Sequence, residues 1–357
     1  MRTGSRPPVL NLPRMSRRAA TLAVAACGIA AALVVASAVR VPYVALLPGP
    51  TLNTLGTSGK EPLIQISGRH TYPTSGHLNL VTVSYIGGPG SRFNVFAALR
   101  AWLSPHEAVV PQEEIFTPGQ TQQQVTKQDT EEMTNSQQTA QVAALCQLKI
   151  NFSVIDTVVS TVKGLPADGL LRRGDVIKAV DGVPVTCTAN SSALIKRHPP
   201  GTRLTLTVAR DGATRTVKVG TKKIGGQAVV GVSIREGFRF PFTVKINISN
   251  IGGPSAGLMF ALGIVDKLTP GDLTGGRFVA GTGEIETNGK VDPIGGVQQK
   301  MAGARNAGAT VFLTPAANCP DAARAVPAGM RLIKVRSLNG ALDALAALKA
   351  GKPVPGC

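Results

Sequence analysis

A serine stands at a glycine-rich turn in the last third of the chain, in the run Gly253-Pro254-Ser255-Ala256-Gly257. A strand pattern over Phe242–Ile248 precedes this run, and an apolar helix pattern over Leu258–Lys267 follows it. A serine at such a turn exposes its hydroxyl beside the unpaired N–H groups that start the helix. Together these groups could serve as a nucleophile and an oxyanion site. On its own, however, the run is more typical of an anion-binding loop or a simple turn.

A second glycine-rich segment leads to a lysine that could act as the base. After Thr282-Gly283-Glu284-Ile285, an Asn288-Gly289 hairpin turn and Gly295-Gly296 open a predicted helix, and Lys300 borders its apolar face. Loss of hydration against apolar side chains lowers the pKa of a lysine, and a neutral lysine can accept a serine proton. The alternative is a structural lysine whose stem covers apolar surface while its charge reaches water.

Taken together, these segments resemble the Lon-type serine–lysine proteases. The shared motifs are G-P-S-A-G at 253–257, T-G-E-I at 282–285, G-x-V-x-P-I-G-G at 289–296, and a lysine four residues later, at 300. The resemblance covers roughly the last third of the chain.

The resemblance implies a role for each matching residue. Ser255 would be the nucleophile, Lys300 the general base, and Thr282 a hydroxyl that orients the lysine amine. The supporting loop residues would be Gly253, Pro254 and Ala256. Lys290 is rejected as the base because it lies beside an exposed hairpin turn. Many relatives carry an acid three positions before the serine, where this chain has Gly252, so the role of that acid in shaping the loop is open.

Other catalytic chemistries find little support in the sequence. The four histidines lie outside the peptidase segment and near no nucleophile motif, and their spacing does not fit a metal site: His70, His77, His106 and His198. Gly283 to Lys290 does not match a phosphate-binding loop. We therefore predict no metal, no cofactor and no dependence on ATP.

A segment in the middle of the chain resembles the PDZ domains of bacterial proteases. Its motifs are Leu165–Ile177 and Val180–Val185, followed by a helix pattern over Ser191–Arg197 and strand patterns over Leu204–Val208 and Thr214–Val219. Such domains bind an extended peptide by adding a strand to a sheet edge, which implies a polypeptide partner. The alternative is a domain that only shields or spaces the peptidase.

Near the N-terminus, Ala19–Val39 is apolar, uncharged and long enough to cross a membrane as a helix. Arg14, Arg17 and Arg18 precede it, which predicts a cytoplasmic N-terminus and an extracytoplasmic remainder. The alternative is a cleaved signal peptide, because Ala36-Ser37-Ala38 fits a cleavage site.

Cysteine usage agrees with a location outside the cytoplasm. Beyond Cys27, in the apolar segment, the cysteines are Cys146, Cys187, Cys319 and Cys357. An even number suggests disulfides, and proximity favours Cys146–Cys187 and Cys319–Cys357 among three pairings. Four unpaired buried thiols are the alternative.

The chain carries a formal net charge of +18, and only 4% of its residues are aromatic. A basic surface is typical of proteins with acidic neighbours such as an anionic membrane or wall polymer, although it also occurs without a special partner. Because no basic cluster is interleaved with stacking aromatics, we predict no nucleic-acid binding.

The arrangement of span, PDZ-like segment and Lon-like segment resembles the small membrane-bound PDZ–Lon proteases, and this resemblance implies an α+β chain with an inserted PDZ domain. The expected segments are a cytoplasmic tail (1–18), a transmembrane helix (19–39), N-terminal strands and helices of the peptidase fold with a linker (41–148), a PDZ-like domain (150–222), the peptidase domain (227–350) and a C-terminal tail (351–357). Within the third segment, strands are expected at Leu63–Ile66 and His77–Tyr85, a short helix at Phe93–Leu103, a break at Pro48-Gly49-Pro50, and a helix or helical linker in the second half of Gln120–Leu148.

The predicted function is that of an ATP-independent, single-pass endopeptidase of the plasma membrane that cleaves extracytoplasmic polypeptides with a serine–lysine dyad. The resemblance also implies assembly into a ring, with a hexamer as the candidate. The alternative function is a catalytically silent PDZ scaffold at the cell envelope. The complete set of Ser255, Thr282 and Lys300 favours the enzyme.

Overall fold

The computed structural model describes residues 16–91, 93–249 and 251–357, which divide into two units. The first unit comprises the described residues up to Leu46 together with Tyr85–Gln120, and the second comprises Leu47–Ser84 and Thr121–Cys357. Most of the predicted cytoplasmic tail, including Arg14, lies outside the described residues.

The first unit contains one helix, among the described residues of the chain, that is long and apolar enough to cross a membrane. This helix is α1 (Arg17–Ala38), and a signal sequence near an N-terminus passes the same test. The remaining elements of the unit are α2 (Val95–Trp102), β6 (Ala108–Pro111) and α3 (Gln112–Ile115). The first residues of β1 (Tyr43–Asn53) pair with β6 in antiparallel register.

The second unit is built on a largely parallel sheet. Its strand order is β20-β19-β16-β5-β1, and β16 pairs in parallel with both β5 and β19. The bounds are β5 (His77–Gly87), β16 (Phe278–Gly281), β19 (Val311–Pro315) and β20 (Arg331–Val335). Because β1 and β5 precede the PDZ-like segment whereas β16 follows it, the PDZ-like segment is an insertion, as expected.

Helices and short strand pairs complete the core of this unit. They are α4 (Gln122–Gln147), α6 (Gly257–Leu268), α7 (Val297–Asn306), α8 (Cys319–Ala322), α9 (Leu338–Lys349), β2 (Thr57–Ser58) with β3 (Glu61–Pro62), β4 (Ile64–Ser67) with β15 (Thr243–Ile246), and β17 (Glu284–Ile285) with β18 (Val291–Asp292). Nearly all of α6 is buried, and it packs against α4 and α9. Burial of an apolar side chain contributes about 1.5–3 kcal/mol, so α6 is the main anchor of this core.

The predicted break at Pro48-Gly49-Pro50 is wrong, because β1 continues through it. A Cβ atom at Gly49 would lie 2.8 Å from the backbone carbon of Thr82 in β5. The Thr82 hydroxyl donates to the Pro50 carbonyl, and Gly303 of α7 packs against the Gly49 carbonyl. Because Gly49 and Gly303 lack side chains, β1 can lie close to both β5 and α7. Gly49 is therefore explained by close packing and not by a chain break.

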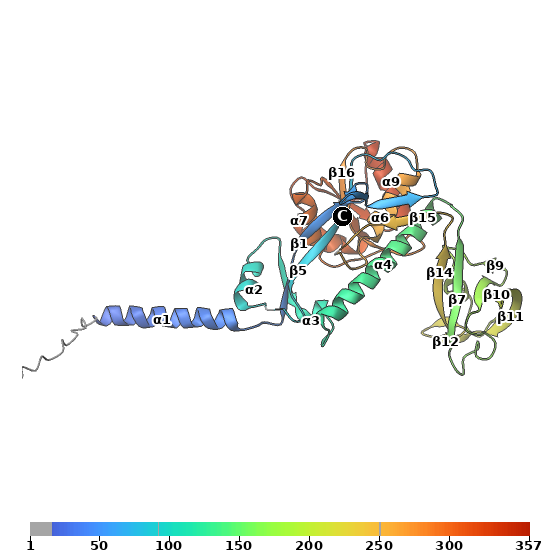
Figure 1. Ribbon diagram of the computed structural model, residues 1–357, viewed down its shortest axis with the longest axis horizontal. Coiled ribbons are helices and arrows are strands. Elements are labelled where there is room, and N and C mark those ends of the chain that lie inside the picture. Colours follow the sequence, from blue (N-terminus) through green and yellow to red (C-terminus); the bar gives the residue numbers. More distant parts are fainter. Residues whose placement is uncertain (1–15, 92, 250) are drawn as a thin grey trace, which may run out of the picture. The chain divides into compact units, whose positions relative to one another are not determined.

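Strands β7 to β11 and β14 form a sheet of their own (Figure 1), in the order β11-β10-β8-β7-β14 with β9 attached to β8. Its elements are β7 (Ser153–Thr161), β8 (Val176–Val180), β9 (Val183–Pro184), β10 (Arg203–Arg210), β11 (Ala213–Gly220), β14 (Val232–Arg239) and α5 (Ser191–Lys196), with the hairpin β12 (Lys222–Ile224) and β13 (Gln227–Val229) beside them. The sequence placed residues 227–239 at the start of the peptidase, but β14 pairs with β7 along its length and Val230 is buried in the core of this sheet. These residues are therefore part of the PDZ-like fold.

Helix α4 also begins earlier than its composition suggested. A helix or helical linker was expected in the second half of Gln120–Leu148, whereas α4 starts at Gln122 and includes the Gln- and Thr-rich first half. Its start is a capping box, in which the Thr121 side chain accepts from the Gln124 N–H and the Gln124 side chain accepts from the Thr121 N–H. This motif satisfies two of the donors that a helix start leaves unpaired, and it was readable in the sequence.

Two disulfides join distant segments of the second unit. One links Cys146, at the end of α4, to Cys187 in the PDZ-like fold, and the other links Cys319 of α8 to Cys357. Cys27 is an exposed free thiol in α1. These pairings are the ones that proximity along the chain favoured.

Candidate active site

The loop that carries Ser255 lies between β15 and the N-terminus of α6. Gly253 adopts φ +83°, a conformation that other residues rarely take, and Ala256 is the N-cap residue of α6. Among the described residues, no acceptor is bound by the N–H groups of Ser255 and Ala256. The loop therefore presents a hydroxyl together with backbone donors at a helix start.

Lys300 reaches this loop from α7, which starts after Gly296 in the left-handed conformation (φ +65°). Its neighbour Met301 is fully buried in an apolar cluster with Phe312 and Ala280, and Lys300 itself is only 4% exposed. Burial lowers the pKa of Lys300 to about 7, because removal from water disfavours the charged ammonium. A large fraction of the amine is therefore neutral at neutral pH.

Ser255, Lys300 and Thr282 lie within hydrogen-bonding distance of one another. The Lys300 Nζ lies 2.9 Å from the Ser255 Oγ and donates to the Thr282 Oγ1 over 3.3 Å. The Thr282 hydroxyl in turn donates to the backbone carbonyl of Ser255 over 3.0 Å, and the Gly283 N–H donates to the same carbonyl. Because the hydroxyl proton of Thr282 is engaged, its lone pairs face the amine and fix the position of Nζ.

The remaining residues singled out in the sequence fall into two groups. Pro254 lies in the loop next to the serine, and its carbonyl accepts from the Gly257 N–H. Lys290 lies outside this arrangement, 57% exposed, with its Nζ bonded to Glu286 and Asp292. Those two carboxylates raise the pKa of Lys290, so this lysine is held in the charged form that cannot act as a base.

The sequence reading missed Ser136, which holds the serine loop from α4. Ser136 is 5% exposed, and its hydroxyl donates to the Pro254 carbonyl over 2.9 Å. It stands among buried apolar residues, between Met133 and Ala140, on the face of α4 that enters the core. A serine on an otherwise apolar helix face was the signal that could have found it, since buried hydroxyls need a partner.

Asp129, also on α4, lies against the position where many relatives carry an acid. A Cβ atom at Gly252 would lie 2.4 Å from the Cβ of Asp129, so a side chain at residue 252 is excluded. The Asp129 carbonyl accepts from the Gly253 N–H over 3.1 Å. Burial, and then the neighbouring Glu132, raise the pKa of Asp129. A carboxyl group is thus present beside the serine loop, supplied by a different element.

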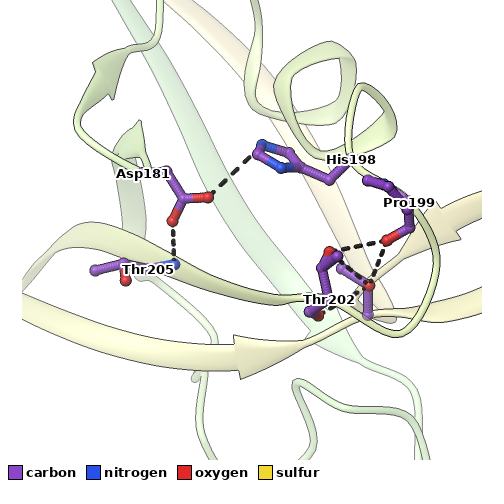
Figure 2. Close-up of polar contacts among 6 residues, drawn as sticks. Asp181, His198, Pro199, Thr202 and Thr205 are labelled. Atoms are coloured by element: carbon purple, nitrogen blue, oxygen red, sulfur yellow. Dashed lines mark hydrogen bonds and ion pairs between the residues drawn. The ribbon is translucent and has the colours of Figure 1, made fainter.

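A histidine–aspartate pair does occur, but within the PDZ-like fold. Figure 2 shows the His198 ring facing the Asp181 carboxylate, with 3.6 Å between Nε2 and Oδ2. The second carboxylate oxygen accepts from the Thr205 N–H, while Thr202 donates to the Pro199 carbonyl. These contacts fasten turns of the fold. In the described part of the chain, no cluster of three or more His, Cys, Asp or Glu side chains could hold a metal.

Comparison with known families agrees with the geometry. Residues 249–346 match the model of the Lon protease (S16) C-terminal proteolytic domain, and residues 125–221 match the PDZ domain model. This part of the chain therefore belongs to the Lon-type serine peptidase domains, and a PDZ domain precedes it. The sequence-based recognition of both domains, and of an α+β fold, is confirmed.

Curated relatives match between 19% and 27% of the chain. The chain is 48% identical over 69 residues to the Lon protease of Roseiflexus castenholzii, a match that covers 19% of this chain and 8% of that protein. It is 36% identical over 95 residues to the Lon protease of Mycolicibacterium smegmatis, covering 27% and 12%, and 37% identical over 94 residues to Lon protease 1 of Bacillus subtilis, covering 26% and 12%. The chain thus spans 8 to 12% of the length of these relatives.

Solved structures similar to this chain include two bacterial domains. The PDZ domain of the SdrC-like protein from Listeria innocua is 18% identical, with a TM-score of 0.21, covering 22% of this chain and 92% of that one. The solution structure of GtR34C from Geobacillus thermodenitrificans is 28% identical, with a TM-score of 0.19, covering 22% and 92%.

The contact between Ser136 and the serine loop leads to a first prediction. Ser136→Ala removes one of the two donors to the Pro254 carbonyl and leaves the Gly257 N–H, so the cost is that of one hydrogen bond, about 0.5–1.5 kcal/mol. We expect the loop to shift and kcat/KM for an unfolded protein substrate to fall about tenfold. The matched control is Thr134→Ala, which removes an exposed hydroxyl from the same helix. Equal activity of both variants would show that Ser136 does not position the loop.

Proposed function

We propose that this chain is an endopeptidase in which Ser255 is the nucleophile and Lys300 the general base. The observation that carries the proposal is the 2.9 Å separation between the Lys300 Nζ and the Ser255 Oγ, on a lysine that is 4% exposed. A general base must lie within hydrogen-bonding reach of the proton it takes and must be unprotonated when it acts. Lys300 lies within that reach, and the lowered pKa of its amine favours the neutral form.

The proposed reaction proceeds in two stages. In the first, neutral Lys300 takes the Ser255 proton as the oxygen attacks a peptide carbonyl, and the N–H groups of Ser255 and Ala256 stabilise the oxyanion. The lysine ammonium then gives a proton to the leaving amine, which leaves an acyl-enzyme. In the second stage, Lys300 takes a proton from water as the water oxygen attacks the ester carbonyl, and the ammonium then gives this proton to the departing Ser255 Oγ, which regenerates both side chains. Thr282 keeps the amine aimed at the serine throughout.

We propose that the PDZ domain binds segments of the polypeptide substrate. β14 is an edge strand of its sheet, with β7 on one side only. A cavity of about 230 Å³ lies beside it, lined mainly by apolar residues that include Ile195 of α5, Val232 of β14 and Val230, which lies between β13 and β14. An extended peptide could add to the free edge of β14 and place alternate side chains in this cavity.

We further propose that α1 anchors the protein in the plasma membrane with the peptidase on the extracytoplasmic side. Arg17 and Arg18 at the start of α1 favour a cytoplasmic N-terminus. The two disulfides support an oxidising compartment for the remainder. Proteolysis without ATP, assembly as a ring and a lack of nucleic-acid and metal binding stay predictions from the sequence.

Removal of either proposed catalytic side chain tests the mechanism. Ser255→Ala and Lys300→Met should each lower kcat/KM for an unfolded protein by at least about a thousandfold, because both act in one proton transfer. Lys290→Gln is the matched control, because it removes an exposed lysine outside the site, and it should keep wild-type activity. Cleavage should be followed by gel and mass spectrometry. Equal cleavage by all variants contradicts the dyad, and a wild-type protein that binds substrate but never cuts it supports the silent scaffold.

The lowered pKa of Lys300 predicts the pH dependence of the reaction. The active form is the neutral amine, so kcat/KM should rise with pH, with an apparent pKa of about 7, and level off above it. Between one pH unit below this value and one above it, the neutral fraction grows roughly tenfold. The profile should be measured with a short peptide and repeated with Lys290→Gln. A flat profile, or a rise centred near 10.5, would contradict a buried lysine base.

A further inference from the structure

Helix α2 (Val95–Trp102) has its large apolar side chains on the outside. Its only buried residue is Ala101, while the bulky residues are exposed: Val95 37%, Phe96 39%, Leu99 49%, Trp102 71% and, at the C-cap, Leu103 69%. These residues recur at helical spacing and so form one face of the helix, which we call the α2 face. Globular helices turn such residues inward, so the α2 face requires a partner.

The position of α2 beside the end of α1 indicates which partner that is. The Asn94 side chain, which caps α2, donates to the Ser37 carbonyl in the last turn of α1 over 3.2 Å. The Val41 N–H donates to the Phe93 carbonyl over 3.0 Å, and Arg40 bridges to Asn94. All of these residues belong to the first unit. The start of α2 is therefore tied to the point where α1 would leave the bilayer.

The chemistry of the α2 face matches the boundary between the lipid chains and water. Trp102 is the chain's single tryptophan, and tryptophan is enriched at this depth because its ring is apolar and its N–H is polar. Arg100 lies within the same helix and is paired with Glu107 over 3.6 Å, but 66% of its side chain stays exposed, and a long basic side chain of this kind can extend to lipid phosphates. Apolar residues on one face with a basic residue beside them are typical of interfacial helices.

We propose that α2 lies in the outer interface of the membrane, with the α2 face buried among lipid chains. The inference rests on the proposed membrane anchor. It goes beyond that anchor because it makes α2 a second contact with the lipid, next to α1. Two attachments restrict the tilt and rotation of the first unit in a way that a single span does not. A second copy of the chain is the competing occupant of the α2 face.

Trp102 fluorescence in the full chain distinguishes these outcomes. The protein should be reconstituted into vesicles of phosphatidylcholine and phosphatidylglycerol that contain a lipid with a spin label on an upper acyl carbon. We expect lipid-borne label to quench the emission at least twofold, and aqueous iodide to quench it little. Quenching by iodide but not by lipid would show a free surface, and protection from both would show a protein partner. Either result would overturn the proposal.

Variants separate this inference from the anchor on which it rests. Phe96→Ser with Leu99→Ser should reduce lipid quenching of Trp102 at least twofold while the chain still floats with the vesicles through α1. The control is Val326→Ser, an exposed apolar residue of the second unit that should change neither signal. A wild-type chain that does not float would overturn the anchor and this inference together. A floating chain without lipid quenching overturns the interfacial helix alone.

Discussion

The proposed chemistry depends on the burial of one amine. Lys300 would be a strongly hydrated ammonium in water, but α7 holds it among apolar side chains where only 4% of it is exposed. Removing this amine from water is unfavourable. The neighbouring Met301 on the same helix offsets part of this desolvation cost, because its side chain is fully buried in the core. The same burial that costs stability lowers the pKa of Lys300 to about 7 and so prepares the amine to take a proton. Such opposition between stability and activity is typical of catalytic groups.

Two elements from distant parts of the chain hold the hydroxyl that faces this amine. The buried helix α6 fixes the C-terminal end of the serine loop, while α4 fastens the rest through Ser136 and the Asp129 carbonyl. The other end of α4 carries Cys146, which is bound to Cys187 of the PDZ domain. One helix thus has covalent contact with the proposed substrate-binding domain and polar contact with the proposed nucleophile loop.

Much of this arrangement could be predicted from the sequence, because glycine-rich turns and apolar periodicity are local signals. They placed Ser255 at a helix start and Lys300 on an apolar face, and the structure brings the two together. The contributions of α4 could not be read in the same way. Its first half is rich in Gln and Thr, and the contact between Ser136 and Pro254 joins residues 118 positions apart. The edge strand β14 was misassigned because pairing with β7 depends on tertiary register, which no local pattern encodes.

The protonation state of the Lys300 amine can be measured directly and without any substrate. The protein labelled with carbon-13 at the lysine ε position should be titrated by NMR, with Lys300→Met identifying the resonance. We expect a midpoint near 7 for that resonance, with the exposed Lys290 still charged at this pH. A midpoint near the ordinary lysine value of 10.5 would contradict this expectation.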